Sequence, residues 1–343
     1  MTGGAIARRC MTRRTFARRL CAPDVNAVEH PGGVPLIQGY DPQGRAARQP
    51  LFPFPPINLP TVQPPLSTTL SLSPPRPLES AAEPIDLSLP GLPPGLEGKS
   101  VLHLSDLHVR RYRPWFRRLC DMVARMRPDL CVLTGDYMTL PGDEAPALAV
   151  LRDLAAAISA PLGTYACFGN HDTEAFKRLA RSVTSIRWLE HDAEYRADLN
   201  VTFLGTSTPG DVLACVRRAR EVEPSAPDVS APPPYRILLG HEPTILMVAA
   251  DLGIEWFVGG HTHGGQVRLL WFPHAPHNSS GIPGSLSSGI LRCRNSICTL
   301  SRGLGESYFD VRLMCPVQIP LYRLRKGPLP GSFTPLMRAV RWW

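Results

Sequence analysis

Seven side chains of the types that bind divalent metal ions are concentrated in five short blocks of the sequence. The blocks are Asp106-Leu107-His108, Gly135-Asp136, Gly169-Asn170-His171-Asp172, Gly240-His241 and Gly260-His261-Thr262-His263. Carboxylate, carboxamide and imidazole ligands without a thiolate suit Mn, Fe or Zn rather than a structural cysteine-zinc site. Seven protein ligands are too many for one ion, and they suit two ions if one carboxylate bridges them. The seven candidate ligands are Asp106, His108, Asp136, Asn170, His241, His261 and His263.

The charge of such a site indicates the kind of substrate. The two carboxylates offset about half of the positive charge of two divalent ions, and the neutral imidazoles and the carboxamide offset none, so the site attracts phosphate. In two-metal sites, ions about 3.5–4 Å apart hold the attacking and leaving oxygens of an in-line displacement and supply hydroxide at neutral pH. His171 lies one residue beyond Asn170, so its side chain points elsewhere and is available as a general acid. The residue types therefore favour phosphoryl transfer.

Each block follows a short apolar segment with the length of a buried strand. The five segments are residues 101–105, 130–133, 165–168, 237–240 and 256–258. Helical periodicity over residues 115–126 and 146–158 separates the first three segments, which gives the order βαβαβ. Asp106 lies 30 residues before Asp136, and Asp136 lies 34 before Asn170, each about the length of one βαβ unit. We therefore expect a parallel sheet with the ligands at the carboxyl ends of its strands, where open α/β sheets bind ligands.

In their order and spacing, the five blocks resemble the motifs of the calcineurin-like metallophosphoesterases over about residues 99–325. The resemblance implies an α/β fold, a four-layer α/β/β/α sandwich. It assigns the first metal ion to Asp106, His108, Asp136 and His263, and the second to Asn170, His241 and His261, with Asp136 as the bridge. It also implies in-line attack of metal-bound hydroxide, with His171 protonating the leaving oxygen and Asp172 orienting His171. Mn²⁺ is the first expectation for both ions, and Fe and Zn are alternatives because the same ligands accept several divalent metals.

Two further segments resemble a bacterial branch of that family, often peripheral to membranes, in which some members cleave the pyrophosphate of UDP-2,3-diacylglucosamine. They are Gly264-Gly265-Gln266-Val267 and Ser301-Arg302-Gly303-Leu304-Gly305. The sequence departs from this branch at Pro316-Val317-Gln318-Ile319, where Pro-Glu-Ile is common, so the support at the edge of the site is expected to differ. The expected activity is hydrolysis of a phosphodiester or pyrophosphate. The alternatives are a nuclease with the same two-metal site and a non-catalytic metal-binding scaffold.

Three arginines directly after the first block are candidates for substrate binding. Arg110, Arg111 and Arg113 precede Trp115 and Phe116, and arginine binds phosphate while aromatic side chains favour the headgroup zone of a membrane. The functional interpretation is a rim that binds a phosphorylated small molecule or a lipid-linked substrate, with peripheral membrane contact. The alternative is a solvated helix start with both aromatic side chains packed inward. Nucleic acid is disfavoured as a partner because the sequence shows no obvious stacking platform or extended basic track beyond this rim.

The composition divides the chain of 343 residues, which carries a formal charge of +8, into four parts. Residues 1–22 are a basic leader whose Arg13-Arg14 pair resembles a twin-arginine signal without its apolar core, and residues 23–98 are a Pro-rich linker expected to be largely disordered. Residues 99–327 are expected, from the resemblance, to form a domain of the metallophosphoesterase type, and residues 328–343 a tail. No apolar run approaches the roughly 18 residues of a membrane span. A cytoplasmic or peripheral membrane location is favoured over export.

Overall fold

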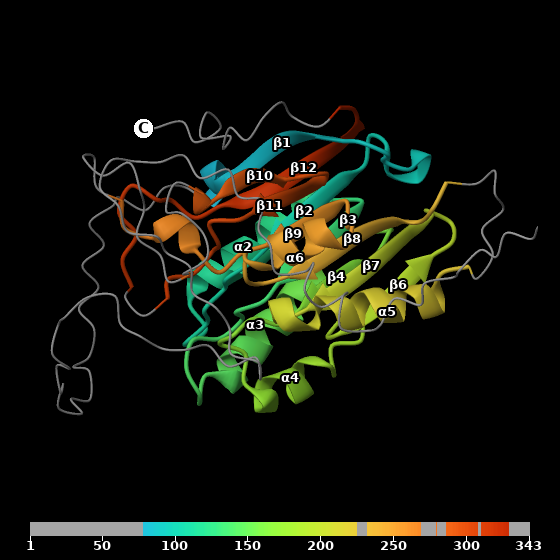
Figure 1. Ribbon diagram of the computed structural model, residues 1–343. Helices are drawn as coiled ribbons and strands as arrows, with labels where there is room; N and C mark the ends of the chain where they lie inside the picture. The colour runs from blue at the N-terminus through green and yellow to red at the C-terminus, as the bar shows by residue number, and fades with distance from the viewer. Residues whose placement is uncertain (1–77, 225–231, 269–278, 280–285, 308–309, 329–343) are drawn as a thin grey trace, which may run out of the picture. The chain divides into compact units, whose positions relative to one another are not determined.

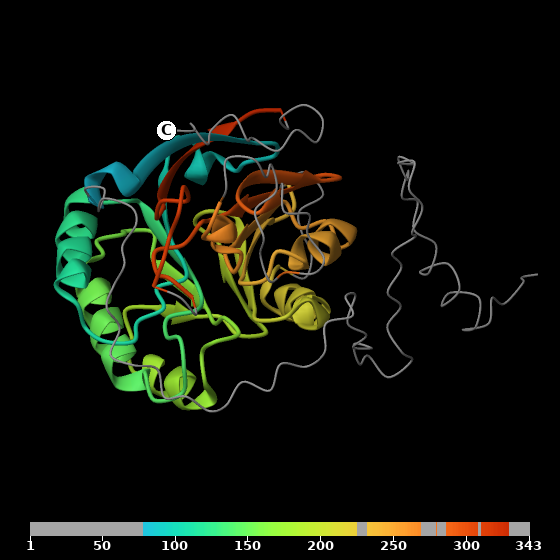
Figure 2. The same ribbon diagram turned by 90° about the vertical axis from the view of Figure 1, so that its left-hand side faces the viewer.

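Two six-stranded sheets face each other in the computed structural model, and helices cover the outer face of each (Figures 1 and 2). The structure describes residues 78–224, 232–268, 279, 286–307 and 310–328. The strands are β1 (Ala82–Leu89), β2 (Ser100–Leu104), β3 (Leu130–Thr134), β4 (Thr164–Cys167), β5 (Arg187–Trp188), β6 (Asp192–Arg196), β7 (Val201–Thr206), β8 (Tyr235–Gly240), β9 (Trp256–Gly259), β10 (Gly289–Cys293), β11 (Ser296–Leu300) and β12 (Ile319–Lys326). The α-helices are α2 (Pro114–Met126), α3 (Glu144–Ala157), α4 (Glu174–Ala180), α5 (Val212–Val222) and α6 (Ile245–Asp251).

The first sheet has the strand order β1-β12-β2-β3-β4-β5, and its central strands β2, β3 and β4 are parallel. Strand alternation sends Leu102 and Leu133 toward α2, α3 and α4, while Val101 and Val132 point to the opposite face. Proline fixes φ and needs no amide partner at the first position of α2, which suits Pro114 to begin that helix. The predicted βαβαβ unit is therefore present, with strand and helix bounds close to those expected from periodicity.

The second sheet has the order β10-β11-β9-β8-β7-β6, and α5 and α6 cover its outer face (Figure 2). Ile237, Leu239 and Val258 point inward and pack with Val132 of the first sheet in a core between the two sheets. Leu238 and Phe257 point outward to α5 and α6. Three apolar layers thus separate four layers of secondary structure, and the expected α/β/β/α sandwich is confirmed.

The start of the domain differs from the sequence-based expectation. Residues 78–98 were expected to belong to the Pro-rich linker, but they contain β1, which pairs in parallel with β12 at the edge of the first sheet. Leu87 and Leu89 of β1 are buried between the sheets. Pro84 is compatible with this strand because an edge strand leaves one row of amides outside the ladder. The linker prediction is therefore wrong for residues 78–98, whereas the leader, the rest of the linker and residues 329–343 lie outside the described residues.

No helix in the described part of the chain is both long and apolar enough to cross a membrane.

Candidate metal centre

The candidate ligands lie directly after strands of both sheets, in an unusual backbone conformation. Asp106, His108 and Asp136 follow β2 and β3 of the first sheet with φ of 53°, 44° and 55°. His261 and His263 follow β9 of the second sheet with φ of 75° and 52°. Residues other than glycine rarely adopt this left-handed backbone conformation. Each one lowers the stability of the folded state by about 1–3 kcal/mol, which the surrounding structure must offset. Strain of this kind concentrates at functional sites, so its presence at five candidate ligands agrees with a functional role.

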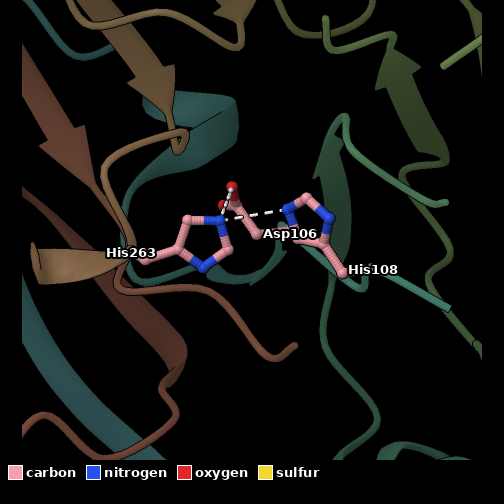
Figure 3. A group of neighbouring side chains, drawn as sticks. All are labelled: Asp106, His108 and His263. Carbon is pink, nitrogen blue, oxygen red and sulfur yellow. Dashed lines mark hydrogen bonds and ion pairs between the residues drawn. The ribbon is translucent and has the colours of Figure 1, made fainter. Parts of the chain in front are cut away.

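The first group of ligand atoms belongs to Asp106, His108 and His263, which converge from separate segments (Figure 3). The Nε2 atoms of His108 and His263 are 3.0 Å apart, and Oδ1 of Asp106 lies 3.4 Å from Nε2 of His263. All three residues are buried. Two imidazole nitrogens and a carboxylate oxygen directed at one point form a donor set that suits a divalent cation.

The second group belongs to Asp136, His241 and His261. Oδ2 of Asp136 lies 2.9 Å from Nε2 of His241. Asn170 joins this group, because its Oδ1 atom lies 3.0 Å from Nδ1 of His261. Nδ1 of His241 donates to the carbonyl oxygen of Thr134 at 2.7 Å, which turns Nε2 toward the carboxylate. The donor chemistry of this group also fits a divalent cation.

Asp136 connects the two groups. The same Oδ2 atom that faces His241 lies 3.4 Å from Nε2 of His108 in the first group. Oδ1 of Asp106 lies 3.9 Å from Nε2 of His241, so the two groups are adjacent. The structure therefore brings all seven candidate ligands into one largely buried cluster with a carboxylate at its centre.

The histidines of the cluster hold different numbers of protons in the absence of metal. Burial lowers the pKa of His263 to about 3 and, with the neighbouring His241, that of His261 to about 4, so both rings are neutral at pH 7. Burial also disfavours a charged His241, but the carboxylates of Asp136 and Asp106 raise its pKa to about 10. Burial alone would raise the pKa of Asp136, yet His241 and His108 hold it well below the usual range. Burial also disfavours a charged Asp106, but His263 and His241 lower its pKa, so the metal-free site holds an Asp136–His241 ion pair and a second carboxylate, Asp106.

His171 contacts the site through its backbone amide and its ring. The amide of His171 donates to Oδ1 of Asp136 at 2.9 Å, and Nδ1 of His171 donates to the carbonyl oxygen of Thr139 at 2.7 Å. The ring of His171 stands edge-on to that of His108, with centroids 4.9 Å apart. His171 thus lies beside the first group, and the contact with Thr139 places the imidazole proton on Nδ1 in the neutral ring.

Asp172 lies between the turns that follow β3 and β4, and its role in orienting His171 stays a prediction. Its carboxylate accepts hydrogen bonds from the amides of Asp136 at 3.0 Å, Tyr137 at 2.8 Å and Gly169 at 2.7 Å. Asp172 therefore holds the turns after β3 and β4 against each other. The carbonyl oxygen of Thr139 accepts the hydrogen bond from the His171 ring.

A buried hydrogen-bond chain behind Asp106 escaped the sequence analysis. Ser105 donates from Oγ to Oδ2 of Asp106 at 2.5 Å, and Thr134 donates from Oγ1 to Oγ of Ser105 at 2.8 Å. Since each hydroxyl has one proton, His103 must be the donor in its 2.8 Å contact between Nε2 and Oγ1 of Thr134. The chain fixes Oδ2 of Asp106 and leaves Oδ1 directed at His263. Position at a strand end was the only sequence signal for Ser105.

The three candidate substrate-binding arginines lie beside α2. Arg113 forms an ion pair with Asp310 at 2.9 Å, and Arg110 lies 3.8 Å from the same carboxylate. Arg111 is exposed. Trp115 and Phe116 pack against the core beneath α2, as the alternative interpretation expected. The aromatic side chains therefore belong to the core. The three arginines lie between His108 and α2 in the sequence, and two of them are near Asp310.

Comparisons with known proteins agree with this geometry. A family model described as calcineurin-like phosphoesterase matches residues 99–265. The phosphodiesterase YaeI of Escherichia coli (strain K12) is 31% identical over 235 residues, which cover 65% of this chain and 81% of that protein.

More distant relatives share most of the domain. The uncharacterized metallophosphoesterase YkuE of Bacillus subtilis (strain 168) is 24% identical over 267 residues, 73% of this chain and 87% of that protein. The UDP-2,3-diacylglucosamine pyrophosphatase LpxG of Chlamydia muridarum (strain MoPn / Nigg) is 23% identical over 295 residues, 71% of this chain and 89% of that protein. With two paired ligand groups at the strand ends and relatives that span the same domain, the chain belongs to the calcineurin-like phosphoesterase family, whose members are metal-dependent hydrolases.

Proposed function

We propose that this protein hydrolyses a phosphodiester or pyrophosphate bond in a lipid-linked or sugar-nucleotide substrate, using two divalent ions held by the seven clustered side chains. The position of Asp136 carries the proposal. Its Oδ2 atom faces His108 in one ligand group and His241 in the other, so this carboxylate is placed where two ions would share it. Mn²⁺ is the favoured ion among those that accept carboxylate, amide and imidazole ligands.

The seven clustered side chains are assigned to two metal ions. Asp106, His108 and His263 would hold one ion, Asn170, His241 and His261 would hold the other, and Asp136 would be shared. Two such ions stabilise charge on the phosphoryl group and lower the pKa of a water molecule.

His171 supplies the proton for the leaving oxygen. Because Nδ1 donates to Thr139, the imidazolium form presents its other proton on Nε2, beside the first ligand group. Arg110, Arg111 and Arg113 would contact a phosphate of the substrate at the edge of the site, with Asp310 holding two of them in place.

The relatives support the substrate class without fixing it. One is named a phosphodiesterase and another a pyrophosphatase of a diacylated sugar nucleotide. Both names describe cleavage of a phosphate that carries two substituents. This favours diesters and pyrophosphates over monoesters for the present chain.

The test is an activity screen on purified protein with Mn²⁺ and with metal content measured on the same sample. The substrates are a phosphomonoester, an activated phosphodiester, UDP-2,3-diacylglucosamine and single-stranded DNA. We expect turnover of the diester or the sugar nucleotide that is lost with a chelator and restored by Mn²⁺. Cleavage of DNA alone would make the protein a nuclease, and two bound ions without turnover of any substrate would make it a scaffold.

Two variants separate metal binding from proton transfer. His171→Ala is expected to retain both ions and lose about 10²–10⁴-fold in turnover, because a general acid contributes a factor of that size. Asn170→Ala is expected to lose affinity for one ion as well as turnover. A His171→Ala protein with unchanged turnover would contradict the assigned role.

A further inference from the structure

The segment Ser301–Gly305 lies directly against the backbone of the first ligand group. The amide of Gly305 donates to the carbonyl oxygen of Asp106 at 2.6 Å, and the amide of Leu304 donates to the carbonyl oxygens of Ser105 and Asp106 at 3.0 and 3.3 Å. A Cβ atom on Gly303 would lie 2.6 Å from Cβ of Asp106, and one on Gly305 would collide with the carbonyl of Leu107. These contacts hold the left-handed backbone that aims Asp106 into the site.

Arg302 anchors this segment from inside the protein. Its side chain is 5% exposed, and its Nη2 atom donates to Oε1 of Glu83 at 2.6 Å. Nε of Arg302 donates to the carbonyl oxygen of Pro316 at 3.1 Å. A buried guanidinium needs a charged partner, because an unpaired charge away from water is strongly destabilising.

Gln318 completes the anchor between Arg302 and Glu83. Its Oε1 atom accepts from the amide of Arg302 at 3.1 Å, and its Nε2 atom donates to Oε2 of Glu83 at 2.7 Å. The amide of Gln318 also donates to the carbonyl of Gly303 at 3.1 Å. Gln318 lies in the segment where the resembled branch commonly has Pro-Glu-Ile, and here the carboxylate of this network comes from β1 instead.

We propose that Glu83 is a positioning residue for the Asp106 half of the metal centre, acting through Arg302 and the segment 303–305. Glu83 lies on β1, outside the residues 99–265 that the family model matches. The inference rests on the proposed function to the extent that the seven clustered residues bind metal. If Glu83 has this role, β1 supports the metal centre and does more than extend the edge of the first sheet.

The hydrogen-bond pattern allows an exchange of the carboxylate between positions 83 and 318. In Glu83→Gln, the new amide nitrogen faces the amide nitrogen of Gln318, and two donors oppose each other. In Gln318→Glu, two carboxylates oppose each other. In the double variant, the new carboxamide at position 83 accepts from Arg302 and donates to the new carboxylate at position 318, so every contact has a donor and an acceptor again. The anchor is therefore broken by either single change and rebuilt by both.

The experiment measures Mn²⁺ binding by calorimetry on the metal-free full-length protein, its two single variants and the double variant. The expected effect of Glu83→Gln is a loss of about 10-fold in affinity for one of two ions, the lower end of the range for a direct partner of a ligand, because Glu83 acts through Arg302. The double variant is expected to recover most of this affinity. Asp86→Asn, an exposed carboxylate on the same strand, is the matched control and should bind as the unaltered protein does.

A second measurement does not depend on metal. Hydrogen exchange of the Leu304 and Gly305 amides in the metal-free protein should be faster in Glu83→Gln and restored in the double variant. If Glu83→Gln does not fold, a folded double variant with two ions supports the proposal.

The proposal is overturned by wild-type affinity in Glu83→Gln, by an equal loss in Asp86→Asn, or by a double variant that is unfolded or no better than the single one. Failure of the unaltered protein to bind Mn²⁺ would instead overturn the proposed function, so the two failures are distinguishable.

Discussion

Protons would compete with a metal ion for His241 more than for His261 or His263. The carboxylates of Asp136 and Asp106 raise its pKa to about 10, so the metal-free protein carries a proton there at neutral pH. His261 and His263 are neutral at that pH because burial lowers their pKa to about 4 and 3. A metal ion at Nε2 of His241 must therefore displace a proton, whereas the other two rings are ready to bind.

The pH dependence follows from the direction of this shift. The pKa of His241 is raised on folding, so its ion pair stabilises the metal-free protein fully below about pH 6.5 and is lost as pH rises through 10. The metal-bound protein has the opposite dependence, and its affinity for Mn²⁺ should rise about tenfold per pH unit below 10 for the one proton displaced. Calorimetry at pH 7.5 in buffers of different ionisation enthalpy should show release of this proton, and His241→Ala should abolish it. Binding without proton release in the unaltered protein would contradict the assignment.

At the scale of elements, the ends of the strands could be predicted from the sequence. The hydrogen bonds and ion pairs that hold the residues at those ends could not. Apolar runs followed by Asp106, Asp136 and Asn170 at the spacing of βαβ units locate three strands and the edge where they meet. The hydrogen bonds of Ser105 and the ion pair of Arg302 depend on tertiary neighbours far away in sequence, and no local pattern marks them. Strand β1 was missed for a different reason, since proline in its neighbourhood suggested an extended linker, while its two buried leucines are a weak signal in eight residues.

Glycine at position 303 is required by the element that supports Asp106, and an alanine there tests this. Gly303 and Gly98 share a φ of +74°, but a Cβ on Gly98 meets nothing within 4 Å. Gly98→Ala therefore isolates the conformational cost, about 1–2 kcal/mol of unfolding free energy. Gly303→Ala should cost more in denaturant unfolding and also weaken Mn²⁺ binding, because its Cβ would displace Asp106. Equal effects of the two substitutions on metal binding would show that the close approach has no role.

At the scale of the whole domain, each ligand group draws on both sheets. Asp106 and His108 follow a strand of the first sheet, and His263 follows a strand of the second. In the other group, Asp136 comes from the first sheet and His241 from the second. An ion in either group would thus cross-link the sheets, in addition to the apolar core and to polar contacts such as the hydrogen bond from His241 to Thr134. Because an unfolded chain does not bring these side chains together, metal binding should stabilise the folded domain.

This linkage predicts a large effect of metal on thermal stability. An ion present at 100 times its dissociation constant stabilises by about 2.7 kcal/mol, which corresponds to a rise in Tm of roughly 5–10 °C for a domain of this size. We expect Mn²⁺ to raise the Tm of the metal-free protein by at least this amount, and a chelator to reverse the change. Asp136→Asn removes the shared carboxylate and should lose most of the Mn²⁺-dependent shift, whereas Asp86→Asn should keep it. An Asp136→Asn protein with the full shift would show that the two ligand groups bind metal independently of the carboxylate between them, and a shared centre would no longer describe the site.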